Sequence, residues 1–174
     1  MSPLVLLVCV GVVAVGADLA GVTVTDGDCL CVVGTGVNAR DRPSGACSAR
    51  EKELACELLR NPKIGLARVH PSGKTDNAYA YNNLRDMCNG LKASRSSYSC
   101  SECATGAPGG TVCLSEKVLE YLATLAQKYD DVYVTELAGA CHSCSSLHYS
   151  GKAVDLRIPG TRAQRQGYLD TCKT

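Results

Sequence analysis

The sequence predicts an α+β fold in which helices pack on a small antiparallel sheet and disulfides hold the chain together. Apolar residues recur at helical spacing in several segments, and short runs of β-branched residues lie between them. The chain also has 12 cysteines in 174 residues, a density typical of oxidising compartments. Apolar residues make up 45% of the chain and charged residues 20%, so it can bury a core.

The first predicted helix begins after Ser48. Ser48 and Glu51 stand three residues apart, as in a capping box that satisfies the first free amides. Leucines at helical spacing follow, and Pro62 ends the helix because proline cannot continue it. Ser115 and Glu116 start another predicted helix, which ends near Tyr129. Residues 75–89 and 161–172 are also predicted to be helical.

The predicted strands are short and separated by turns. Alternating or β-branched residues favour strands over 64–69, 131–137 and 153–158. A turn is expected at His70–Gly73, and a loop rich in Ser, Gly and Cys over 93–110. Residues 22–43 predict short strands with tight turns.

The N-terminus resembles a secretory signal peptide. Residues 2–17 carry no charge and end in Val15-Gly16-Ala17, the small residues that signal peptidase requires. The competing interpretation is a membrane anchor, but the run is shorter than the ~20 apolar residues that span a bilayer. We therefore predict a signal peptide over 1–17, a short β-rich segment over 18–47 and one domain over 48–174. The mature protein is expected to be extracellular and free of the membrane.

The charge balance excludes one class of partner. The chain has 18 Lys plus Arg against 17 Asp plus Glu, for a formal net charge of +1. Nucleic-acid-binding proteins normally carry a clear basic excess that neutralises phosphates. The sequence therefore predicts no nucleic-acid partner.

Cleavage after Ala17 would remove Cys9 and leave an odd number of cysteines, and most of these should form disulfides in a secreted chain. The odd thiol is free, pairs with another chain, or lacks its partner. Two C-x-x-C pairs leave a zinc knuckle or a redox pair as the alternative for four of them. The eleven disulfide candidates are Cys29, Cys31, Cys47, Cys56, Cys88, Cys100, Cys103, Cys113, Cys141, Cys144 and Cys172.

The residues with the most informative chemistry lie between Ser146 and Asp155. They read Ser146-x-His148-x-x-Gly151-x-Ala153-x-Asp155. A glycine between the histidine and the aspartate lets the loop turn, so that the following strand can return the carboxylate beside the imidazole. These two groups form a partial ligand set for zinc, and a catalytic site requires a third ligand and an open position for water.

This pattern resembles the zinc-binding signature of the D-alanyl-D-alanine carboxypeptidases and endopeptidases that share the hedgehog-like zinc fold. The resemblance implies that fold, a Zn²⁺ cofactor held by His148 and Asp155, and peptidoglycan peptides as substrate. It covers most of residues 48–172. Further segments in the family's order are 59–64, 82–90, 107–110 and 134–139. Separately, residues 36–44 resemble the opening of bacterial Src-homology-3-like cell-wall modules.

The third zinc ligand of that family is missing from its usual place. The family has a further histidine downstream of the aspartate, near an acidic residue that acts as general base. Here no His follows His148 and no Glu follows Glu136, so we expect a domain incomplete at its C-terminus or a non-catalytic relative, with zinc weak or absent. His142 stands where many members have an arginine that faces the substrate, which suggests a substrate-binding role; an exposed structural role is the alternative. His142 or His70 would replace the missing ligand only if the fold brings it to the metal.

Three functions follow from these observations. The first is a secreted zinc peptidase that hydrolyses peptidoglycan stem peptides. The second is a non-catalytic protein that binds peptidoglycan through the same cleft. The third is an extracellular structural protein held by disulfides, with the odd cysteine available for a disulfide-linked partner.

Overall fold

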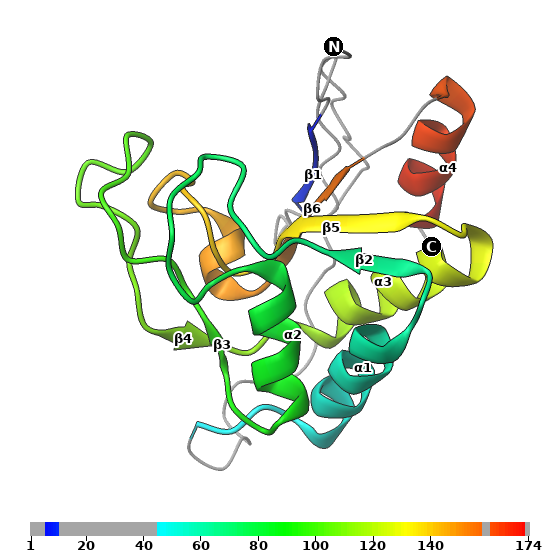
Figure 1. The fold of residues 1–174 in the computed structure, drawn as a ribbon, viewed down its shortest axis with the longest axis horizontal. Coiled ribbons are helices and arrows are strands. Elements are labelled where there is room, and N and C mark those ends of the chain that lie inside the picture. The colour runs from blue at the N-terminus through cyan, green and yellow to red at the C-terminus, as the bar shows by residue number, and fades with distance from the viewer. Residues whose placement is uncertain (1–5, 11–44, 158–160, 173–174) are drawn as a thin grey trace, which may run out of the picture.

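The computed structural model describes residues 6–10, 45–157 and 161–172. Within these ranges the chain forms α-helices and short strands, which confirms the α+β class (Figure 1). The α-helices are α1 (Ala49–Arg60), α2 (Ala80–Cys88), α3 (Glu116–Lys128) and α4 (Arg162–Cys172), and a 3₁₀ helix, η1, spans Leu147–Ser150.

The main sheet is mixed rather than antiparallel, which corrects the sequence prediction. Its strands are β1 (Leu6–Val10), β2 (Ile64–Leu66), β5 (Val132–Glu136) and β6 (Ala153–Arg157), in the order β1-β6-β5-β2. Strand β6 is antiparallel to both of its neighbours, but β2 runs parallel to β5. A parallel pair needs a long crossover, and the segment that contains α2 and α3 supplies it.

The helix N-termini follow the predicted caps in two cases, and α2 differs. Both halves of the Ser48–Glu51 capping box are present, and Ser115 caps α3 through the Val118 amide, 3.3 Å away. Helix α2 starts at Ala80 instead of residue 75. Asp76 Oδ1 accepts a hydrogen bond from the Ala78 amide, 2.8 Å away, so this carboxylate holds a turn that replaces the predicted first helical turn.

The core lies between the sheet and three helices. Helices α1, α2 and α3 gather on one side of β2 and β5 (Figure 1). The predicted loop over 93–110 begins with strand β3 (Ala93–Ser94), which pairs with β4 (Thr111–Val112). The fully buried apolar side chains include Leu54, Leu58, Leu84, Leu119, Leu122, Val134 and Leu156.

Much of the N-terminal prediction lies outside the described residues. The β-rich segment up to residue 44, the Src-homology-3-like stretch, Cys29 and Cys31 all fall there. Residues Leu6–Val10 form β1 on the edge of β6, inside the segment predicted to be a signal peptide, whose removal stays a prediction. None of the described helices is long and apolar enough to cross a membrane.

Disulfides, and not a zinc knuckle, account for the two C-x-x-C pairs. Each cysteine of one pair bonds to a cysteine of the other. Cys172 is also disulfide-bonded. The described disulfides with both partners resolved are Cys47–Cys113, Cys56–Cys88, Cys100–Cys141 and Cys103–Cys144.

Candidate metal centre

His148 and Asp155 converge as the sequence pattern predicted. His148 lies in η1, whose N-cap Ser146 accepts a hydrogen bond from the His148 amide. Gly151 follows η1 with a φ of 70°, and a side chain there would collide with the Cys113 carbonyl. Glycine is therefore required at this bend. The bend leads into β6 and brings Asp155 Oδ1 to 3.1 Å from His148 Nε2, with both side chains buried.

The other ring nitrogen of His148 fixes its orientation. Nδ1 lies 2.6 Å from the Leu137 carbonyl oxygen, which can only accept, so Nδ1 carries a hydrogen. Nε2 then faces a carboxylate oxygen, and two acceptors at this distance require a proton or a cation between them. Burial lowers the pKa of His148, but the hydrogen bonds to Asp155 and Leu137 outweigh it, and the net pKa is raised.

His142 joins these two residues. Its ring stacks on that of His148 with centroids 3.9 Å apart and an interplanar angle of 5°. One ligand atom from each of His142, His148 and Asp155 lies within 4.8 Å of the other two. His142 Nε2 is buried and has no hydrogen-bond partner among the described residues. Such an atom is an available ligand, because burial without a partner is otherwise costly.

The protonation state of His142 also suits a ligand. Burial, and then the charge on His148, lower its pKa to about 4. The ring is therefore neutral near pH 7 and offers a lone pair, as metal ligation requires. The substrate-binding role predicted for His142 stays a prediction, while the geometry favours the alternative in which it replaces the third ligand.

Two disulfides hold the segment that carries His142. Cys141 precedes it and bonds to Cys100, and Cys144 follows two residues later and bonds to Cys103. The segment is thereby attached at both ends to the loop between β3 and β4. A short segment fixed at two points has little freedom, so His142 keeps its place beside His148.

His70 belongs to a different cluster and cannot serve as the third ligand. It is buried, and its Nδ1 lies 2.8 Å from Glu136 Oε1 while its Nε2 lies 2.7 Å from Asp76 Oδ1. Both nitrogens are thus engaged by carboxylates. Burial lowers the pKa of His70, but these two carboxylates raise it above its ordinary value overall, so they favour the protonated ring.

Glu136 links the two clusters, and sequence reasoning did not select it. The β5–β6 register shifts between Val134 and Glu136, and this irregularity places Glu136 opposite Asp155. Cross-strand partners project from the same face of a sheet. Burial raises the pKa of Glu136, and the charge on Asp155 adds to this effect against the opposing influence of His70. A charged residue that ends an otherwise uncharged strand was the signal that could have identified it.

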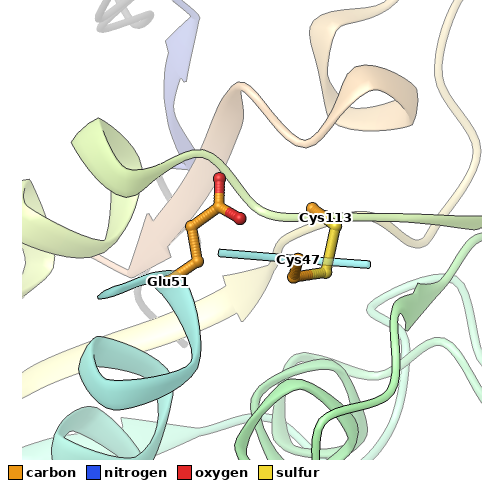
Figure 2. Close-up of side chains that lie close together, drawn as sticks. All are labelled: Cys47, Glu51 and Cys113. Carbon is orange, nitrogen blue, oxygen red and sulfur yellow. A yellow bond between two sulfur atoms is a disulfide. The ribbon is translucent and has the colours of Figure 1, made fainter. Parts of the chain in front are cut away.

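A second group of ligand types does not form a metal site. Cys47, Glu51 and Cys113 lie close together (Figure 2). Their two sulfur atoms are bonded to each other, and a disulfide supplies no thiolate. Glu51 Oε2 accepts a hydrogen bond from the Ser48 amide, 2.7 Å away, so the carboxylate caps α1.

Comparisons with family models, with curated proteins and with solved structures find no match for this chain. The assignment of its function therefore depends on the geometry of the His142, His148 and Asp155 cluster.

Proposed function

We propose that this chain is a secreted zinc metallopeptidase related to the D-alanyl-D-alanine carboxypeptidases and that it hydrolyses peptidoglycan stem peptides. The observation that carries the proposal is the convergence of three ligand atoms, from His142, His148 and Asp155, within 4.8 Å of one another. Two imidazoles and a carboxylate are a common zinc ligand set and leave a fourth position for water. Secretion is supported by the N-terminal apolar run and by the disulfides.

The donor set fits zinc on the evidence of the side chains themselves. His148 presents Nε2 because Leu137 occupies Nδ1. His142 presents an unpartnered, buried Nε2. A bound cation would replace the proton in the hydrogen bond between His148 Nε2 and Asp155 Oδ1. Hydrogen bonding of the second imidazole nitrogen is the usual way in which a protein orients a histidine ligand.

When bound, zinc lowers the pKa of a coordinated water to ~7 and polarises the scissile carbonyl. The chain's own contribution is to receive a proton, and we assign that role to Glu136. Its Oε2 is buried without a hydrogen-bond partner among the described residues, on the sheet face that it shares with Asp155. His70 holds the other oxygen, Oε1, and so fixes the carboxylate in place.

The test is metal content and turnover of the purified, disulfide-bonded protein. We expect one zinc per chain by elemental analysis and release of D-alanine from muropeptides. His148→Ala and Asp155→Asn should lose both. Asp130→Asn is the matched control, because Asp130 is a carboxylate with a 90% exposed side chain at the surface. Wild-type protein without zinc would refute the metal centre.

Glu136→Gln separates chemistry from metal binding. We expect it to keep zinc and to lose about 10²–10⁴-fold in turnover, the usual contribution of a general base. Unchanged turnover would remove Glu136 from the mechanism. If the wild type binds zinc and sediments with insoluble peptidoglycan but releases no D-alanine, the non-catalytic binding function is correct instead.

A further inference from the structure

The segment that presents His142 has a strained backbone. Ala140 has a φ of 69°, and it is the only non-glycine residue with a positive φ in the described part of the chain. An alanine seldom adopts this conformation unless neighbouring contacts impose it. This unusual backbone conformation lies two residues before the candidate ligand His142, so contacts that maintain it also help to place His142.

The hydroxyl of Tyr149 hydrogen-bonds the backbone of Ala140 and of His142, on either side of Cys141. It accepts a hydrogen bond from the His142 amide, 2.9 Å away, and donates one to the Ala140 carbonyl, 3.0 Å away. The Tyr149 ring stands edge-on to the His142 ring with centroids 5.9 Å apart. One buried phenol therefore fixes the backbone and the ring environment of His142.

Tyr149 is itself held firmly. Only 5% of its surface is exposed, and its carbonyl accepts a hydrogen bond from Arg95 Nη1, 3.1 Å away. It follows His148 directly in η1. The same short helix thus carries one ligand and the side chain that supports the other.

The remaining contacts restrain the segment mainly beside His142, although the Cys100 sulfur lies 3.6 Å from the His142 carbonyl oxygen. Ser96 Oγ accepts a hydrogen bond from the Ala140 amide, 2.9 Å away. The disulfides of Cys141 and Cys144 hold the chain on either side. Among these contacts, the Tyr149 hydroxyl is the one that hydrogen-bonds the backbone of the ligand residue.

We propose that Tyr149 is a positioning residue that holds His142 as the third ligand of the metal centre, an inference that rests on the proposed zinc site. Groups that orient a ligand without touching the metal typically change metal affinity by about 10–100-fold when they are removed. Tyr149→Phe should therefore weaken Co²⁺ binding by about that factor and alter the visible absorption bands of bound Co²⁺.

The matched control is Tyr121→Phe. Tyr121 is also buried, and its hydroxyl donates to a backbone carbonyl, that of Tyr168, 3.2 Å away. It lies in α3 and contributes nothing to the His142, His148 and Asp155 cluster. We expect this variant to bind Co²⁺ with the affinity and spectrum of the wild type. A purely structural effect of losing a buried hydroxyl would appear in both variants.

A double-mutant cycle identifies the route of the effect. If Tyr149 acts through His142, Tyr149→Phe should have no further effect on Co²⁺ affinity in a His142→Ala background. Additive losses would overturn the inference. Should Tyr149→Phe fail to fold, 3-fluorotyrosine at position 149 keeps the shape and acidifies the hydroxyl. It should shift Co²⁺ affinity relative to the same replacement at position 121, and no shift would overturn the inference.

The zinc site and the role of Tyr149 are tested separately by the same measurements. A wild-type protein that binds no Co²⁺ refutes the proposed zinc site, and the role of Tyr149 falls with it. A wild type that binds Co²⁺ as tightly as Tyr149→Phe, with the same spectrum, refutes only the role of Tyr149.

Discussion

The two buried histidine clusters are built from the same residue types but differ in what the ring nitrogens contact. In the first, His148 Nδ1 is bonded to a backbone carbonyl, and Nε2 points toward His142 and Asp155. In the second, both nitrogens of His70 are bonded to carboxylates. A metal ligand needs a lone pair. His148 can offer Nε2 to a cation that it shares with Asp155 and His142, whereas both nitrogens of His70 are held by carboxylates outside that group.

The largest effect should follow from removing the histidine of the second cluster. His70→Ala leaves the buried Glu136 and the half-buried Asp76 without their shared partner, and breaking a buried ion pair in this way costs about 3–5 kcal/mol. We expect a loss of this size in urea unfolding of the metal-free protein.

The same variant should retain its metal when it is folded at low temperature, since His70 is no ligand. His148→Ala should show the reverse relation, with the metal lost. A folded His70→Ala protein without zinc would show that the two clusters are one functional unit and do not act separately.

A smaller effect is expected from the disulfides. Replacing Cys103 and Cys144 by serine should cost about 2–4 kcal/mol of stability and should also weaken zinc binding, because this bridge fixes the segment that carries His142. Titration with a fluorescent zinc chelator measures the affinity.

The control is the bridge between Cys56 and Cys88. It joins α1 to α2 over a sequence separation of 32, against 41 for Cys103–Cys144. Its removal should lower stability by a similar amount and leave zinc affinity unchanged. Equal losses of affinity in both variants would mean that the bridges act only through global stability.

The smallest effect concerns pH. Burial opposes the charge on His70, but its two carboxylates raise its pKa in the folded state above the ordinary value. The stability that comes from holding the protonated His70 between these carboxylates is fully present below pH ~6.5. It is lost as pH rises through the raised pKa of His70. The raised pKa of His148 acts in the same direction and over the same range. That of Glu136 also acts in this direction, but from the lower pH of an ordinary carboxyl group.

The metal-free protein should therefore become less stable as pH rises above ~6.5, by at most about 1.4 kcal/mol per pH unit for one proton. Thermal unfolding of the wild type and of His70→Gln, from about pH 6 to about pH 9, measures the slope. The variant should have a shallower slope, because the contribution of His70 is lost while that of His148 remains. An equal slope in both proteins would assign the titration to another group.

Local structure was largely predictable from the sequence. The Ser48–Glu51 capping box and the Ser115 cap depend on residues three apart, and both formed as expected. The approach of His148 to Asp155 depends on a seven-residue bend with a glycine whose φ is positive. Each of these features is decided by neighbours in the chain, so periodicity and spacing could report it.

The role of His142 was not predictable in the same way. Its place beside His148 depends on the disulfides Cys100–Cys141 and Cys103–Cys144, each of which spans a sequence separation of 41. Spacing gives no connectivity for disulfides. The parallel pairing of β2 with β5, and the irregularity that places Glu136 opposite Asp155, likewise involve segments distant in sequence.

The amino-acid sequence alone determined the starts of α1 and α3, the glycine bend and the two residues that meet across it, because short-range sterics and hydrogen bonds govern them. Tertiary packing decided the rest. It brought His142 to that pair and enclosed His70 between two carboxylates. It also placed the Tyr149 hydroxyl against the backbone of residues 140–142. Such contacts depend on which distant segments pack together, and no local pattern specifies that.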